Sequence, residues 1–259
     1  MKRIISLALL IIALSVFTNS TIAQRRVVIN LPKYDLAPYH VGFILAANQM
    51  LFSVKTMDGH SLMRFDPSAA DDLRLNSTEY LQLYEVFGVP TPGFTIGIVG
   101  NLRLGNHFDL RFIPSLAFGE RYLDYNIMRY DISGESELIP VRKSIASTFT
   151  DFPLHIKYRS DRYNNIAAYL LAGAKYSLDL SSNKKNEDRN NNLPVKLEQH
   201  DVSIDVGVGF DFYTTFFKLG IEVKMSYGLF DILIKEDNIY TDGIERINNK
   251  IFQLSFTFE

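Results

Sequence analysis

The stretch HDVSIDVGVGFDF, residues 200–212, places Asp201, Asp205 and Asp211 among bulky apolar residues. Grouped carboxylates can bind calcium or serve as a general acid and base. Calcium loops, however, carry their acids on closely spaced turn residues around a glycine bend. On an extended strand, Asp201 and Asp211 would lie roughly 30 Å apart. Because ionised carboxylates are not stable unpaired among apolar groups, their role depends on which way they point.

A second candidate for chemistry is His155, which alternates with Asp151 and Lys157 on one face of a short segment. A histidine with a nearby acid can act as a general base. The sequence contains no phosphate loop, nucleophile elbow or metal-binding cluster, and it has no cysteine. We therefore expect a chain that is not an enzyme, with no catalytic residue, metal or cofactor. A barrel hydrolase or lipid-modifying enzyme that uses His155 and Asp151 is the alternative.

The elements that must position these residues are β-strands, because apolar and polar residues alternate over most of the chain. The alternating segments are residues 39–54, 94–104, 108–119, 151–159, 166–179, 201–212, 217–227 and 252–258. Short turns at 105–107, 160–165 and 213–216 alternate with long connections at 55–92, 120–143, 181–199 and 228–249. This arrangement is typical of outer-membrane barrels. It predicts an all-β fold, an eight-stranded antiparallel up-and-down transmembrane β-barrel over residues 40–259. Within the first long connection, residues 76–87 (NSTEYLQLYEVF) could form a short helix.

The polar face of these strands is predicted to point inward. It is rich in small residues, which suits the narrow interior of an eight-stranded barrel. A register slip by one residue would turn the three aspartates towards lipid, at a cost of roughly a few kcal/mol each. The inward charges are equal in number, which predicts a lumenal charge network of paired side chains and no conductance. Its members are Arg103, Asp109, Arg111, Asp151, Lys157, Arg159, Lys175, Asp179, Asp201, Asp205, Asp211, Lys218, Glu222 and Lys224.

The N-terminal sequence predicts export from the cytoplasm. Lys2 and Arg3 precede an apolar run, and Thr21-Ile22-Ala23 supplies small residues for a signal peptidase, so residues 1–23 are expected to be a signal peptide cleaved after Ala23. Residues 24–39 would form a periplasmic arm that either leads into the first strand or pairs with a periplasmic partner. Removing Lys2 and Arg3 changes the net charge from −2 to −4, which gives no electrostatic footprint for nucleic acid.

The sequence contains no tryptophan, so an aromatic girdle at the membrane surface would have to be built from other aromatic residues. Tyr122, Tyr125, Tyr158 and Tyr227 lie near the ends of the predicted strands and are the candidates. The expected partners of the barrel include outer-membrane lipid, and the expected location is the cell outer membrane.

Four segments together resemble the PorT family of outer-membrane β-barrels from the Bacteroidota. They are NLPKYDLAPYHVGFILAANQMLF, PGFTIGIVGNLRLGNHFDLRFIPSLAFGERYLDY, DFPLHIKYRSDRYNNIAAYLLAGAKYSLDL and VGVGFDFYTTFFKLGIEVKMSYGL. Particular marks are Arg121 in FGER, the run from Pro153 to Ser160 and the run from Asp211 to Lys218. The resemblance implies a component of type IX secretion, which exports proteins across the outer membrane and, in gliding motility, surface adhesins. Its partners would be other secretion-system proteins on the periplasmic or outer-membrane side. A small porin or a surface-binding barrel is a further alternative.

Overall fold

The computed structural model describes residues 28–259 except 74, 76–77 and 182–194, so the predicted signal peptide and the first residues of the arm lie outside the described residues. The long strands are β1 (Tyr39–Thr56), β2 (Thr78–Val89), β3 (Thr91–Arg103), β4 (Phe108–Phe112), β5 (Ser115–Asp131), β6 (Ser136–Arg159), β7 (Ile166–Asp179), β9 (His200–Tyr213), β10 (Lys218–Gly228) and β12 (Ile244–Phe258). Short elements are β8 (Lys196–Leu197), β11 (Leu233–Ile234), α2 (Ile239–Asp242) and the 3-10 helices η1 (Tyr34–Leu36), η2 (His60–Leu62) and η3 (Pro67–Leu73).

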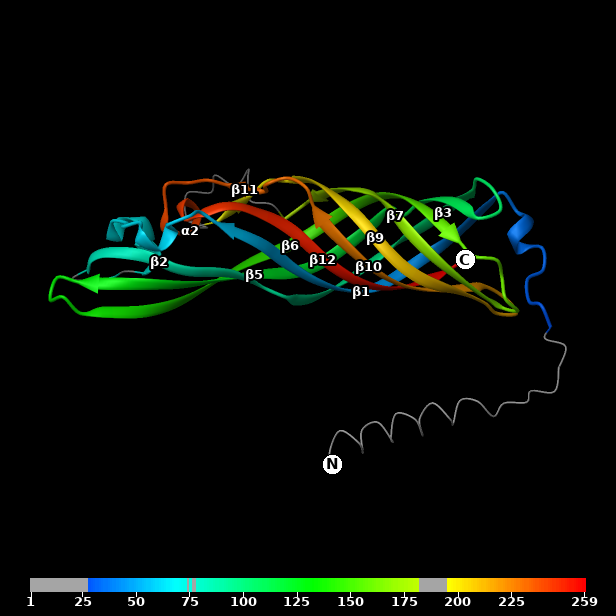
Figure 1. Cartoon of the computed structure of the whole chain (residues 1–259), viewed down its shortest axis with the longest axis horizontal. Coiled ribbons are helices and arrows are strands. Elements are labelled where there is room, and N and C mark those ends of the chain that lie inside the picture. Colours follow the sequence, from blue (N-terminus) through cyan, green and yellow to red (C-terminus); the bar gives the residue numbers. More distant parts are fainter. Residues whose placement is uncertain (1–27, 74, 76–77, 182–194) are drawn as a thin grey trace, which may run out of the picture.

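Eight strands form a ring. The order around the ring is β1, β3, β4 and β5 together, β6, β7, β9, β10 and β12, where β4 and β5 share one position. Neighbouring strands are antiparallel, and β12 pairs with β1 to complete the ring. The strands β4 and β5 keep one register against β3, since Gly100 lies opposite Phe112 and Gly97 opposite Ser115. They are separated at Pro114, which has no backbone N–H to donate to the ladder. The predicted all-β barrel of eight antiparallel strands is confirmed, and Figure 1 shows these strands winding around its long axis.

The two faces of the wall differ as alternation requires. On β9, the side chains of Asp201, Asp205 and Asp211 are at most 5% exposed. The apolar side chains on the other face of the strand are 45–53% exposed; they are Ile204, Val206, Val208 and Phe210. The three aspartates therefore point into the ring, and the apolar face of the strand is its outer surface.

The strands continue well beyond the predicted barrel at one end, which we call the loop end; the opposite end, with the short turns, is the turn end. The predicted loop at 120–143 is wrong, because β5 and β6 extend through it as a long hairpin (Figure 1). The predicted helix at 76–87 is also wrong, since strand β2 begins at Thr78, occupies the described part of this stretch and pairs with β5.

The reason is visible in the alternation itself. On β5 the outward residues Leu116 and Phe118 are apolar, but further along the same strand the inward residues Leu123, Tyr125 and Ile127 are apolar and completely buried. The phase of the pattern is inverted, so this part of the strand packs on a core inside the fold. A strand predicted only from apolar residues on the outer face therefore ends at the inversion, although β5 continues to Asp131.

Inverted segments from several strands meet in a second compartment, the loop-end core. It also contains residues of α2, β8, β11 and the connections between them, towards the left of Figure 1. Its buried members are Phe52, Ala70, Leu81, Leu83, Val86, Leu123, Tyr125, Ile127, Val195, Leu197, Ile232, Leu233, Ile239, Tyr240, Ile244 and Ile247. The described part of the chain contains no helix long and apolar enough to cross a membrane.

Candidate functional site

The ring brings the predicted charged residues together, with one exception. Thirteen of the fourteen are less than 10% exposed and line the interior. The exception is Arg103, which donates hydrogen bonds to the carbonyl oxygen of Gly105 at 2.8 Å and to the side chain of Asn106 at 3.4 Å. As the last residue of β3 it lies at the rim, where its long side chain reaches the turn. Its assignment to the lumenal charge network is therefore wrong.

The centre of the network is built around Arg111. Its guanidinium lies 2.9 Å from Glu222 and 3.3 Å from Glu259, both of which have buried side chains. The hydroxyl of Tyr169 donates a hydrogen bond to Glu222 at 3.0 Å. Glu259 also pairs with Lys218 at 2.5 Å. Each carboxylate thus has an opposite charge and further donors, which is the condition for burying ions inside a protein.

Two further ion pairs cross the wall of the lumen. Lys175 on β7 lies 3.5 Å from Asp151 on the neighbouring strand β6, and Lys157 on β6 reaches past β7 to Asp211 on β9 at 2.7 Å. Asp205 accepts from Nε2 of His155 at 2.9 Å and lies 3.5 Å from Lys224. Asp201 accepts a hydrogen bond from Asn249 at 2.7 Å instead of joining a charge. The three aspartates of β9 therefore belong to separate pairs at successive levels of the barrel.

The enzyme alternative combined His155 with Asp151, and the structure does not bring these two together. His155 bonds to Asp205, whereas Asp151 accepts from Ser177 at 2.6 Å and pairs with Lys175. The imidazole reaches Asp205 across Gly173 of β7, where an added Cβ would lie 2.9 Å from the ring. His155 is completely buried, and any reaction there would require a substrate to enter a filled lumen.

Arg121 is a member of the interior that the sequence analysis missed. It donates to Ser147 at 2.9 Å, pairs with Asp179 at 3.2 Å and stacks over the rings of Phe52 and Phe149 at 4.3 and 4.9 Å. Because it continues the inward phase of Asp109 and Arg111, extending the alternation past Gly119 would have found it. Arg121 lies where the charged lumen meets the loop-end core, and its aliphatic stem and planar head suit both.

Of the predicted girdle tyrosines, Tyr125 is wrongly placed. It is completely buried in the loop-end core, donates a hydrogen bond to the carbonyl oxygen of Tyr240 at 3.2 Å and packs edge-on against its ring at 5.1 Å. Tyr158 is about half exposed on the outer surface, and Tyr122 and Tyr227 are partly exposed. The misplacement of Tyr125 follows directly from the phase inversion on β5.

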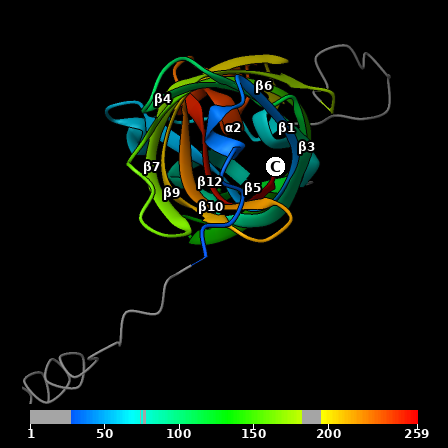
Figure 2. The same cartoon turned by 90° about the vertical axis from the view of Figure 1, so that its right-hand side faces the viewer.

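The turn end of the lumen is covered by the arm, defined here as Val28–Pro38. Figure 2 looks into this end and shows the arm, in blue, crossing the opening of the ring. Tyr34 stacks on His40 at 3.8 Å and donates a hydrogen bond to Glu259 at 2.9 Å. Asp35 bonds to Arg159 and accepts from the hydroxyl of Tyr213 at 2.9 Å. Burial alone would raise the pKa of the Asp35 carboxyl, but its hydrogen bond and charge pairing with Arg159 hold that pKa below its ordinary value.

The lumen is thus filled by paired charges, with the arm at one end and the loop-end core at the other. Near the loop end, the gap lined in part by Lys175, Asp201, Ser203 and Asn249 is too narrow to hold a water molecule. Among the described residues, no group of three or more His, Asp or Glu side chains could hold a metal ion. The arrangement is suited to rigidity, since every strand of the ring is tied to others through its interior.

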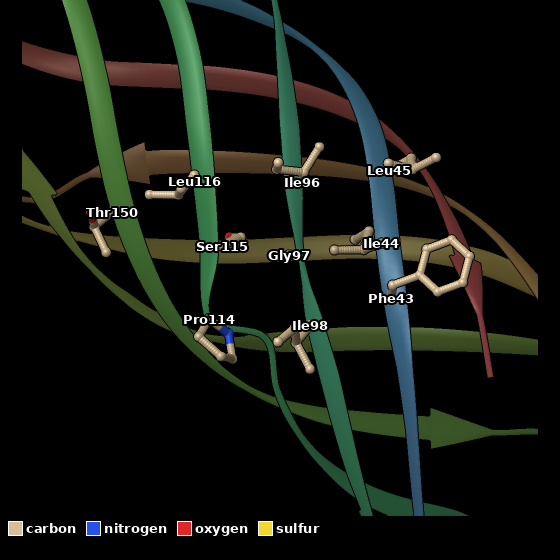
Figure 3. A pocket seen from close by; sticks show the side chains of 10 residues that line it. All are labelled: Phe43, Ile44, Leu45, Ile96, Gly97, Ile98, Pro114, Ser115, Leu116 and Thr150. Carbon is tan, nitrogen blue, oxygen red and sulfur yellow. The ribbon is translucent and has the colours of Figure 1, made fainter.

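The outer surface carries a belt of half-exposed apolar side chains around the ring. A shallow pocket in this belt lies where Pro114 separates β4 from β5. Figure 3 shows Phe43, Leu45, Ile96, Ile98, Pro114 and Leu116 around the backbone of Gly97. The lining is almost entirely apolar, so this part of the surface is suited to the hydrocarbon of a membrane.

Residues 62–233 match the family model of the outer membrane protein beta-barrel domain. No match was found among curated proteins. Similar solved structures include the Neisserial surface protein A, with 11% identity and a TM-score of 0.37 over 86% of this chain and 99% of that one. Another is OprG from Pseudomonas aeruginosa, with 11% identity and a TM-score of 0.36 over 84% and 94%. Because the family model covers more than half of the sequence, the chain belongs to the outer-membrane β-barrel family and resides in the outer membrane.

Proposed function

We propose that this barrel is a non-enzymatic component that assists protein secretion across the outer membrane, as PorT does in type IX secretion. The observation that carries the proposal is the filled lumen, which leaves neither a passage for cargo nor an open site for a substrate. A barrel of this kind acts through its ends and its outer surface. The resemblance of four segments to the PorT family supplies the type IX role.

The ends of the barrel offer surfaces on both sides of the membrane. In outer-membrane barrels the short turns face the periplasm and the long connections face outward. By this rule the arm is periplasmic, and the loop-end core with its β5–β6 hairpin projects from the cell. A secretion component would use the first to contact periplasmic proteins and the second to contact surface proteins. Rigid internal ion pairs would hold both ends in a fixed relation.

Deletion of the gene, followed by comparison of the secreted and surface proteomes, tests this proposal. Proteins that carry the C-terminal secretion signal should accumulate in the periplasm, and a plasmid copy should restore their export. A second plasmid copy with Arg103→Ala, a change at an exposed turn outside the lumenal charge network, should restore export equally well. Normal export in the deletion strain would remove the secretion assignment.

A further inference from the structure

The contact between the arm and the barrel has the form of a ligand in a receptor. The carboxylate of Asp35 belongs to the arm, whereas the groups around it belong to the barrel. Arg159 is the last residue of β6, Arg162 is in the turn that follows, and Tyr213 is the last residue of β9. We call these three residues the mouth site. Arg159 and the hydroxyl of Tyr213 donate charge-assisted hydrogen bonds, the strong class of such bonds, to the carboxylate, and the guanidinium of Arg162 adds an ion pair at 3.7 Å.

The mouth site also binds peptide backbone. Arg162 donates to the carbonyl oxygens of Asn30 and Leu31, and the side-chain amide of Asn165 donates to the carbonyl oxygen of Val28 at 2.9 Å. The amide N–H of Asn30 in turn donates to the side chain of Asn165 at 2.9 Å. These contacts hold main-chain groups where the arm bends at Asn30 and Leu31, whose φ is 48°. A partner segment with the same bend would present the same groups.

The barrel orients the mouth site through contacts that do not involve the arm. The guanidinium of Arg162 stacks on the ring of Tyr213 at 3.8 Å and donates to the carbonyl oxygen of Asn164 at 2.8 Å. Arg159 donates to the hydroxyl of Tyr213 at 2.6 Å. The positive charges would therefore stay in place if the arm moved away, and they would then lack their carboxylate.

The arm contributes little apolar burial to its own docking. Val28, Ile29 and Leu36 are 77%, 58% and 74% exposed, so these side chains lie on the free surface of the arm. The arm is held by polar groups and by one aromatic anchor, Tyr34, whose ring lies below the ammonium group of Lys218 at 4.8 Å. Polar contacts of this kind can be exchanged for equivalent contacts from another chain, because little hydrophobic surface has to be re-exposed.

We infer that the mouth site binds a carboxylate-bearing peptide segment of a periplasmic partner, and that the arm occupies this site when the partner is absent. The segment that fits has an aromatic residue next to a carboxylate, as Tyr34 and Asp35 do. Binding would displace the arm and present its exposed apolar residues to the same partner. This site would serve a partner whether or not the barrel takes part in type IX secretion.

The test uses a fluorescent peptide, VINLPKYDLAP, which copies Val28–Pro38, and the folded full-length chain in detergent micelles. In the Asp35→Asn variant the arm has lost its charge, so the site should open to the peptide. We expect this variant to bind the peptide at least tenfold more tightly than the unaltered chain in fluorescence anisotropy. A peptide with asparagine in place of its aspartate should bind the variant at least tenfold more weakly.

Two further substitutions in the Asp35→Asn background separate the mouth site from general attraction to the rim. Arg162→Ala should abolish peptide binding. Arg103→Ala removes the same charge from a neighbouring turn at the same end of the barrel and should leave binding unchanged. Heat-dependent migration in gels checks that each variant is folded. The inference is overturned if the folded Asp35→Asn variant does not bind the peptide, or if the aspartate and asparagine peptides bind equally well.

Discussion

The membrane section of the barrel and the loop-end core are built by the same strands with opposite faces. In the membrane section, apolar residues such as Val208 face outward and charges such as Asp205 are buried. In the loop-end core, Ile127 and Ile244 are buried, and polar residues face outward. On β5 and β6 the register of pairing continues unchanged from one section into the other, from Ser115 opposite Asp151 to Ile127 opposite Ile139. We infer that the surrounding solvent changes, with hydrocarbon around one section and water around the other, because the apolar face changes sides between them.

The comparison also shows how each section is held together. The lumenal charge network depends on complete pairing, because a buried ion without its partner is costly. The loop-end core depends on the removal of apolar surface from water, worth about 25 cal/mol per Å². Substitutions of the same kind should therefore have different effects in the two sections, and the following predictions use this difference.

The largest effect is expected at the centre of the lumen. Arg111→Ala would leave Glu222 without its arginine and Glu259 without one of its two cationic partners. Both carboxylates would still be buried. Removing one partner from a buried pair costs about 3–5 kcal/mol. Urea-induced unfolding in lipid vesicles should show this loss. Arg103→Ala, which removes an arginine that only contacts a turn, should change the free energy of unfolding by less than about 0.5 kcal/mol. Equal effects would contradict the paired lumen.

A second prediction concerns the loop-end core. Ile127→Ala removes a completely buried side chain and should lower the free energy of unfolding by about 2–5 kcal/mol. Ile204→Ala, on the outward face of β9, removes the same atoms from a side chain that is already half exposed and should cost less. If the two substitutions were equally destabilising in the same unfolding measurement, Ile127 would not belong to a core that differs from the outer apolar belt.

A third prediction uses a matched pair of outward apolar residues. Val208 lies in the belt and is 53% exposed, and Leu138 lies on the β5–β6 hairpin and is 47% exposed. Val208→Lys should cost about 2–4 kcal/mol, because the charge faces hydrocarbon. Leu138→Lys faces water and should change stability by no more than about 0.5 kcal/mol. A large cost at both sites would place the hairpin within the membrane.

The smallest effect concerns the arm and pH. The pKa of Asp35 is lowered when the arm is docked, so docking is fully favoured above the pKa of the free carboxyl. It weakens as the pH falls through the lowered pKa, when the carboxyl binds a proton and loses Arg159. Since the chain has no cysteine, Leu36→Cys allows a single spin label on the arm. Its mobility should rise in acid, and adding Asp35→Asn should give high mobility at neutral pH. A label that is equally immobile in both chains would argue against this contact.

The membrane section could be predicted from the sequence more completely than the loop-end core. The eight strands and the inward direction of Asp201, Asp205 and Asp211 could be predicted, because lipid imposes one phase of alternation on all of them. The loop-end core could not be predicted from one phase of alternation, since its apolar residues, such as Leu123 and Tyr125, appear in the opposite phase. Asp35 could not be assigned to the mouth site, because the contact spans more than 120 residues and depends on the three-dimensional closure of the ring.

The central claim is that the lumen is filled and closed, and planar-bilayer recording tests it most directly. The unaltered protein should give no stable conductance steps. The Asp35→Asn variant should give none either, because the charge pairs and the loop-end core remain when the arm is loosened. A stable open channel in the unaltered protein would contradict the account.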